Sequence, residues 1–170
     1  EIDYDVNARE DSLVNMTSHV YFNLDGDPSQ DLSKTHELEI PSSKVVAVGN
    51  DLVGTEIMDI TGTGFDFRKP RLMTDAFNDS YLMKESPLGI DKYYILPEER
   101  KYDAKVRSLK TNKALTIKSD YPGINLYTGN FPNELLLLNN KPMAFHGALA
   151  LEPHFQTNAV NDQRFAGYSL

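Results

Sequence analysis

The sequence predicts a mainly β fold, and three observations support this prediction. Apolar and polar residues alternate with a period of two in several segments, as they do in strands that bury one face. Gly, Pro, Asp and Ser cluster between these segments, where turns are expected. No helical spacing of apolar residues is sustained for the roughly 10 to 12 residues that would indicate a long helix.

The first strands are expected within the first 40 residues. Residues 1–8 alternate throughout and predict a strand at the start of the sequence. After a turn, residues 13–24 alternate again and predict the strand that carries His19. Residues 35–40 predict a short strand that ends at Pro41, because proline cannot donate to a ladder.

The middle of the sequence is less regular than its two ends. Residues 42–90 contain only short apolar pieces, and within them residues 71–85 favour one or two helical turns. Further strands are expected at 92–96, 103–109, 113–119, 124–130 and 144–152. The second and third of these are joined by a tight connection and predict a hairpin.

Composition and charge exclude several classes of function. The net charge is −8 and Lys and Arg are not clustered, which argues against a nucleic-acid-binding protein. No apolar stretch approaches the roughly 20 residues of a membrane-spanning helix, so we expect no membrane partner. The sequence has no cysteine, which excludes disulfides and thiolate zinc sites and fits the cytoplasm as the expected compartment.

Two segments carry residues suited to chemistry. In the predicted strand 13–24, the side chains of Asn15, His19 and Tyr21 share one face, and such a polar row with an aromatic suits a small ligand such as a sugar. Glu152 ends a strand whose matching face carries small alanines, which leaves room for a ligand above the carboxylate. Pattern alone favours an ordinary solvated acid at that position.

Both segments resemble motifs of the aldose 1-epimerases. Residues 15–24 read Asn-Met-Thr-Ser-His-Val-Tyr-Phe-Asn-Leu and resemble the family's Asn-Leu-Thr-Asn-His-x-Tyr-Phe-Asn-Leu. Residues 151–161 resemble Leu-Glu-x-Gln-x-x-Pro-Asp-Ala-x-Asn without a gap, with His154, Thr157 and Asn158 in place of Gln, Pro and Asp.

Three shorter matches follow in the same order as in the family. Residues 61–68 resemble Gly-Thr-Pro-Phe-Asp-Phe-Arg, and residues 121–131 resemble Pro-Gly-x-x-x-Tyr-Thr-Gly-Asn. Residues 89–92 resemble Gly-x-Asp-His, with Lys92 in place of the histidine. Each match is weak by itself, but together the colinear matches cover most of residues 13–161.

The resemblance implies a fold, an activity and a set of site residues. The fold would be part of a large antiparallel β-supersandwich, of the galactose mutarotase type. The activity would be interconversion of the α and β anomers of a free hexose such as galactose or glucose. It implies Glu152 as the catalytic base and His19 as the acid, with Asp91 on the sugar hydroxyls. Asn15 and Tyr21 are further candidates for sugar binding, and neither a cofactor nor a metal is required.

The resemblance also implies that part of the family's fold is missing. Aldose 1-epimerases carry an Arg and a second His ahead of the region that this sequence matches. We therefore expect residues 1–170 to be a single domain and an incomplete fragment, the middle and C-terminal part of a longer fold. This leaves open whether the chain is active alone, which sugar it takes and how it oligomerises.

Two alternatives remain beside the free-hexose epimerase. Lys92, next to Asp91, keeps open an epimerase of phosphorylated hexoses, which would need basic residues around the pocket. A sugar-binding module without turnover is the alternative from another class. A glycosidase would need two carboxylates at a defined separation, and only Glu152 has a supporting context.

Four other polar residues are expected to be structural. Asp66 and Arg68 lie two residues apart and predict an ion pair. His36 and His146 have no identifiable functional neighbours and are expected to be satisfied or surface histidines.

Overall fold

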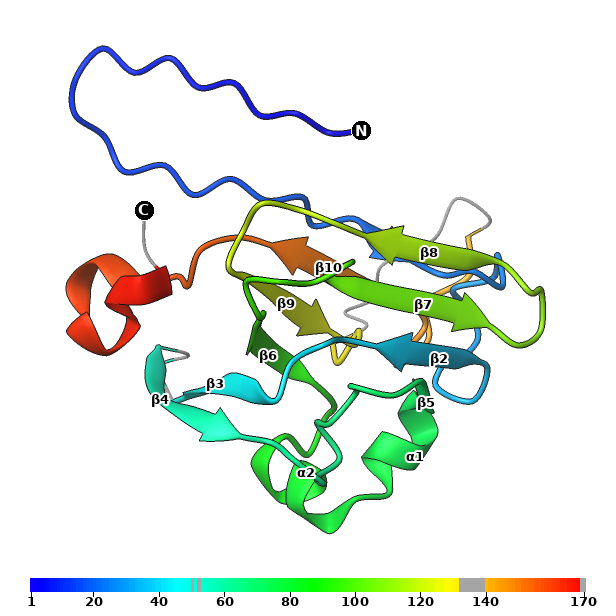
Figure 1. Ribbon diagram of the computed structural model, residues 1–170. Helices are drawn as coiled ribbons and strands as arrows, with labels where there is room; N and C mark the ends of the chain where they lie inside the picture. Colours follow the sequence, from blue (N-terminus) through cyan, green and yellow to red (C-terminus); the bar gives the residue numbers. More distant parts are fainter. Residues whose placement is uncertain (50, 52, 132–139, 169–170) are drawn as a thin grey trace.

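Two antiparallel sheets pack face to face in the computed structural model, which describes residues 1–49, 51, 53–131 and 140–168 (Figure 1). The larger sheet has six strands in the order β1-β10-β9-β6-β3-β4, and the smaller has four in the order β5-β2-β7-β8. Every pairing between neighbours is antiparallel. The mainly β, antiparallel class predicted from the sequence is therefore confirmed.

The larger sheet is built from segments spread over most of the chain. Its strands are β1 (Tyr21–Phe22), β3 (Lys44–Val48), β4 (Gly54–Asp59), β6 (Asp91–Ile95), β9 (Gly123–Tyr127) and β10 (Leu149–Pro153). The smaller sheet consists of β2 (His36–Glu39), β5 (Arg71–Leu72), β7 (Ala104–Ser108) and β8 (Ala114–Ile117).

The helices are short. They are α1 (Met73–Phe77), α2 (Ser80–Glu85) and two 3₁₀ helices, η1 (Ala159–Asn161) and η2 (Gln163–Tyr168). Within the described ranges, none of the helices has the length and apolar composition that crossing a bilayer requires.

Alternate residues along the strands of the larger sheet point to opposite faces, and one of these faces packs in the core. Leu151, Leu126 and Tyr94 of adjacent strands point between the sheets and are almost fully buried, together with Leu38 and Val106 of the smaller sheet. Each such side chain contributes about 1.5–3 kcal/mol by leaving water. The alternate residues therefore point to the opposite face, which we call the outer face of the six-stranded sheet.

The 3₁₀ helices cover one end of that outer face. Ala159 and Phe165 pack there against Val46, Tyr93 and Ile95 in a second, smaller apolar cluster. The remainder of the outer face, over β10, β9 and β6, carries polar side chains.

Several predicted elements are confirmed. The strand expected at 35–40 is β2, and the predicted hairpin is β7 with β8. The strands expected at 92–96 and 124–130 are β6 and β9, and residues 71–85 hold the two short helices.

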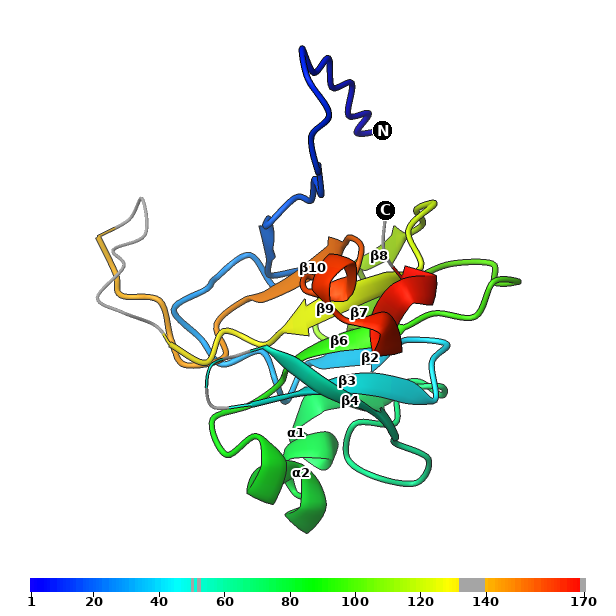
Figure 2. The same ribbon diagram turned by 90° about the vertical axis from the view of Figure 1, so that its left-hand side faces the viewer.

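The predicted strand at residues 1–8 is wrong. These residues form an exposed arm that leads away from both sheets (Figures 1 and 2). Alternation supplies one apolar face, but a strand also needs a neighbour to pair with, and the arm has none among the described residues. Of the strand predicted at 13–24, only Tyr21–Phe22 belongs to a ladder.

Three strands were missed within residues 42–90, the region expected to be irregular: β3, β4 and the two-residue β5. β3 and β4 form a hairpin between Lys44 and Asp59, closed by a hydrogen bond from Gly49 N to Val53 O of 2.9 Å. β4 is exposed along most of its length, so the apolar alternation that identifies a strand is weak there.

The strand predicted at 144–152 begins only at Leu149. His146 has a φ of 54°, in the left-handed region, and Gly147 N donates to Ala144 O in a turn. A Cβ at position 147 would lie 2.1 Å from the carbonyl oxygen of Pro28, so a side chain has no room. His146 and Glu152 therefore do not share a strand.

The four residues expected to be structural are confirmed as such. His36 Nε2 accepts a hydrogen bond from Leu24 N at 3.0 Å, and His146 Nδ1 lies 2.7 Å from Thr128 O. Arg68 donates two hydrogen bonds to Asp66, of 2.9 and 2.7 Å.

Candidate active site

The interior of the larger sheet fixes the position of Glu152. Glu152 lies in β10, directly opposite Asn125 of β9, and both side chains point to the outer face. β10 pairs with β9 on one side and with β1 on the other. Only 10% of the Glu152 side chain is exposed, so its carboxylate is a mostly buried acid on a firmly paired strand.

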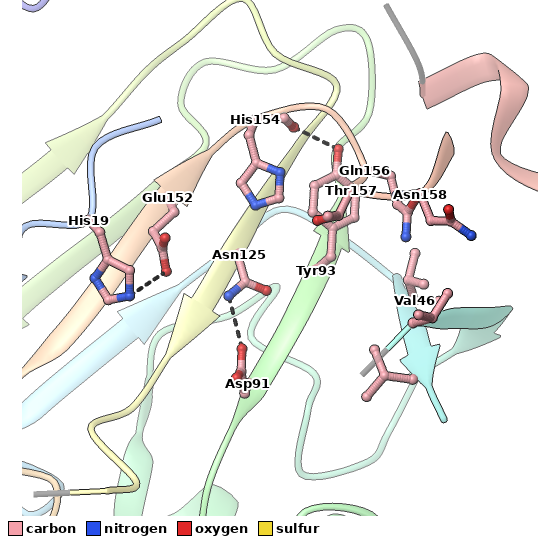
Figure 3. Close-up of a pocket in the computed structure, with 13 residues that line it drawn as sticks. His19, Val46, Asp91, Tyr93, Asn125, Glu152, His154, Gln156, Thr157 and Asn158 are labelled. Carbon is pink, nitrogen blue, oxygen red and sulfur yellow. Dashed lines mark hydrogen bonds and ion pairs between the residues drawn. The ribbon is translucent and has the colours of Figure 1, made fainter. Parts of the chain in front are cut away.

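His19 reaches the carboxylate from the edge of the sheet. Tyr21 of β1 pairs with Ala150, and the same register extended by two residues sets His19 opposite Glu152. His19 Nε2 lies 3.5 Å from Glu152 Oε1 (Figure 3), while 49% of the His19 side chain is exposed. Its ring contacts those of Tyr21 and Tyr127, with centroids 4.9 and 6.1 Å away.

A second polar pair lies beside the first. Asp91 begins β6, and Asn125 Nδ2 donates a hydrogen bond of 3.0 Å to Asp91 Oδ1 (Figure 3). Asn125 thus stands between Glu152 on one neighbouring strand and Asp91 on the other. Strands β10, β9 and β6 present two carboxylates and an amide on one face, and the segment before β1 adds the imidazole of His19.

These groups open into a cavity of about 440 Å³. Its lining residues come from both ends of the chain and from the middle strands: His19, Val46, Val48, Val53, Gly54, Asp91, Tyr93, Asn125, Glu152, His154, Gln156, Thr157 and Asn158. None of these described lining residues is Lys or Arg. Over the part of the chain that the structure describes, no three His, Asp or Glu side chains gather as metal ligands.

The environment raises the pKa of Glu152 above its ordinary value of 4.5. Burial is the largest cause, because it disfavours the charged form. The neighbouring His19 opposes it, as does Asn125 acting as a hydrogen-bond donor, and both favour the carboxylate. His154 also lowers this pKa, and the charge of Asp91 raises it. A carboxyl with a raised pKa beside an imidazole is suited to exchanging protons with a ligand near neutral pH.

The structure brings together three of the five predicted site residues. His19, Glu152 and Asp91 all line the cavity. Tyr21 is not a lining residue, although it contacts the His19 ring and is 46% exposed. Burial, followed by the charges of neighbouring groups, raises the Tyr21 pKa.

Asn15 is not a lining residue either, and its amide is occupied elsewhere. Asn15 Nδ2 donates to Phe155 O at 2.9 Å, and Phe155 N donates to Asn15 Oδ1 at 3.0 Å.

Sequence reasoning missed Asn125, Tyr93 and His154 as lining residues. Tyr93 donates a hydrogen bond from its hydroxyl to His154 O at 2.9 Å, and the two rings lie 5.2 Å apart. Alternation along 123–127 does set Asn125 on the face opposite Ile124 and Leu126. That signal indicates a face, but it does not reveal which residues lie across the ladder.

The comparisons with known proteins all point to the same family. The profile of the aldose 1-epimerase family matches residues 1–170. A galactose mutarotase from Mus musculus is 32% identical over 168 residues, which cover 96% of this chain and 47% of the relative. An aldose 1-epimerase from Escherichia coli is 30% identical, over 87% of this chain and 43% of the relative.

Solved structures give the same result. An aldose epimerase homologue from C. elegans superposes with a TM-score of 0.78 at 28% identity, over 93% of this chain and 47% of that one. A galactose 1-epimerase from Lactobacillus acidophilus gives 0.71 at 26% identity, over 93% and 44%. The chain thus spans less than half the length of these proteins. A profile match over the whole sequence, with a fold and a polar face that agree with it, shows that the chain belongs to the aldose 1-epimerase family.

Proposed function

We propose that this protein interconverts the α and β anomers of a free hexose, with Glu152 as the base and His19 as the acid. The observation that carries the proposal is the 3.5 Å approach of His19 Nε2 to Glu152 Oε1 at the wall of a polar cavity. Relatives are named galactose mutarotase, which makes galactose the first sugar to test.

Anomer exchange requires an acid and a base that act on one ring. The base removes the proton from the hydroxyl on C1, and the acid donates a proton to the ring oxygen as the C1–O5 bond breaks. The open aldehyde then rotates about C1–C2, and the ring closes on the other face of the carbonyl. On closure, the imidazole accepts the proton of the C5 hydroxyl and the carboxyl group returns its proton to the oxygen on C1. Both groups regain their starting states, and no atom is lost or gained.

Asp91 and Asn125 supply the positioning that this chemistry needs. The Asp91 carboxylate accepts hydrogen bonds from sugar hydroxyls, and the Asn125 amide that bonds to it fixes its orientation. Holding the ring in one orientation keeps C1 and the ring oxygen within reach of the acid and the base.

The structure argues against the phosphorylated-hexose alternative. Lys92 is buried on the opposite face of β6 from Asp91, toward the core between the sheets. Burial lowers its pKa, and only the charges of Asp91 and Glu85 oppose this effect. A phosphate in the cavity would therefore meet carboxylates and no cationic Lys or Arg among the described lining residues.

A non-catalytic sugar-binding module is the second candidate, and one observation favours it. His19 is 49% exposed, whereas catalytic acids usually work in sites that exclude water. In such a module the cavity would bind sugar without opening the ring. The expected compartment, the cytoplasm, stays a prediction in either case.

Polarimetry of freshly dissolved α-galactose and α-glucose tests the proposal. The whole protein that contains this chain should accelerate mutarotation, and Glu152→Gln in that protein should abolish the acceleration. Glu37→Gln, which changes a strand glutamate of the smaller sheet, serves as the matched control and should behave as the unaltered chain.

Sugar binding measured by NMR titration separates the two candidates. Binding without acceleration, unchanged in Glu152→Gln, would support the sugar-binding module. An absence of both binding and acceleration would contradict both candidates for this chain.

A further inference from the structure

The ladder between β1 and β10 stops just before it reaches the catalytic pair. His154 N donates to Gly123 O at 3.3 Å, on the β9 side of the strand. Successive residues of a strand direct their N–H groups to opposite sides, so the position of Pro153 faces the β1 side. Proline has no N–H, and the segment before Tyr21 therefore finds no donor there with which to continue the ladder.

Beyond the end of the ladder, hydrogen bonds of the Asn15 side chain stand in for backbone pairing. Its side-chain amide reproduces the reciprocal pair of hydrogen bonds that two strand residues exchange, by donating to Phe155 O and accepting from Phe155 N. Among the described residues, no other hydrogen bond joins residues 13–18 to the rest of the chain. Phe155 is itself held by an edge-to-face contact with Tyr121, with ring centroids 5.1 Å apart.

The acid thus lies on a segment that is fixed at two points. Tyr21 pairs with β10 on one side of His19, and the Asn15 amide binds the backbone just beyond Glu152 on the other. Between these points the segment has an exposed imidazole and no ladder. Without the Asn15 contacts, the pairing of Tyr21 and the side-chain contacts of His19 would be the described interactions left to hold this segment against the end of β10.

We propose that Asn15 is a positioning residue, which does not touch the sugar but sets the distance between His19 and Glu152 by binding the backbone of Phe155. The proposal rests on the proposed function for its catalytic consequence, but not for its geometry. It replaces the expectation that Asn15 binds substrate, because both polar atoms of its amide are engaged away from the cavity.

The titration of the Glu152 carboxyl group reports its interaction with His19, which weakens as the two side chains separate, and it can be followed in the chain without sugar. His19, His154 and Asp91 all act on this carboxyl, and His19 lowers its pKa. With ¹³C-labelled glutamate, His19→Gln should move the Glu152 titration to higher pH. Asn15→Ala should move it in the same direction by a similar amount, because the imidazole drifts away.

Three comparisons make the test decisive. Asn15→Ala added to His19→Gln should cause no further shift, because the interaction is already absent. Ser18→Ala, on the same segment, should titrate as the unaltered chain. Asn15→Asp, which can accept from Phe155 N but cannot donate to Phe155 O, should lie between Asn15→Ala and the unaltered chain.

An unchanged titration in Asn15→Ala, or an equal shift with and without His19, would overturn the proposal. The backbone amide spectrum of each variant establishes that the sheets remain folded.

The kinetics of mutarotation provide a second test of the role of Asn15. Asn15→Ala should lower kcat by roughly 10- to 100-fold with little change in KM, as expected from a misplaced catalytic group. A raised KM with an unchanged kcat and an unchanged Glu152 titration would mean that Asn15 binds sugar, against the proposal. If the whole protein that contains this chain shows no mutarotation, the proposed function fails, while the titration still decides whether Asn15 positions His19.

Discussion

The two members of the candidate catalytic pair are held in very different ways. Glu152 lies within β10, with a partner strand on each side, and its side chain is 10% exposed. His19 lies outside any ladder at the edge of the same sheet, and its side chain is 49% exposed. Glu152 is therefore fixed by backbone pairing and His19 by side-chain contacts, so substitutions should act differently on the two regions.

The largest expected effect separates the two residues by activity. Glu152→Gln should lower the mutarotation rate by roughly 10³- to 10⁴-fold, because the other carboxylate that lines the cavity, Asp91, is bound to the Asn125 amide. His19→Gln should cost only about 10²-fold, because water can reach the exposed acid position and donate in its place. Equal losses in the two variants, measured by polarimetry, would contradict this difference between Glu152 and His19.

Overpacking the firmly held region should reduce stability. A Cβ at Gly123 of β9 would lie 2.2 Å from the ring of Tyr93, so Gly123→Ala forces that ring to move. We expect the free energy of unfolding to fall by about 1–3 kcal/mol, measured by chemical denaturation. In a Tyr93→Ala background the same change should cost much less, and a cost that stays the same would place the strain elsewhere.

Acid should lower the stability of the chain through His36, which binds the backbone just beyond β1. Burial lowers the pKa of His36, and Nε2 accepts the hydrogen bond of Leu24 N just beyond β1. Below about pH 6.5 the unfolded chain binds a proton that the folded chain resists, so stability falls as the pH drops. His36→Gln should flatten this loss between pH 7 and pH 5 in thermal unfolding. An equally steep loss in the variant would assign the effect to other groups, such as His146, whose pKa burial also lowers.

The smallest expected effect lies within the His19 segment itself. Thr17 Oγ1 is buried and has no hydrogen-bond partner among the described residues. Thr17→Val keeps the shape and removes the unsatisfied hydroxyl, so it should raise the free energy of unfolding by up to about 1 kcal/mol. Thr55→Val is the matched control, because Thr55 Oγ1 donates to Ala47 O at 3.2 Å and its loss should destabilise instead.

The sequence was sufficient to single out His19 and Glu152 as candidates, but not to identify the residues that support them. His19 and Glu152 lie in segments with strong resemblance to a family motif, and the structure sets them 3.5 Å apart. Asn15 shares the alternation of His19, so the pattern predicted one common role. Its amide instead binds the backbone of Phe155, 140 residues away in sequence, which no local pattern could reveal.

The errors in the fold have the same physical origin. Alternation at residues 1–8 predicted a strand, but pairing depends on a neighbour that the sequence does not specify. At residues 144–148 the pattern continued into β10, whereas the left-handed His146 and the crowded Gly147 make a turn. Asn125 was missed because its importance comes from Glu152 and Asp91 on the strands beside it.

The exposed arm at residues 1–12 has a practical consequence for anyone who handles this chain. Its one hydrogen bond among the described residues is from Ser12 Oγ to Glu10 O, so its backbone is free to adopt the extended form that proteases bind in their clefts. Nicking should therefore concentrate in this arm, because its backbone is exposed and unpaired among the described residues. Trimming would stop short of the Asn15 contacts and leave the two sheets intact.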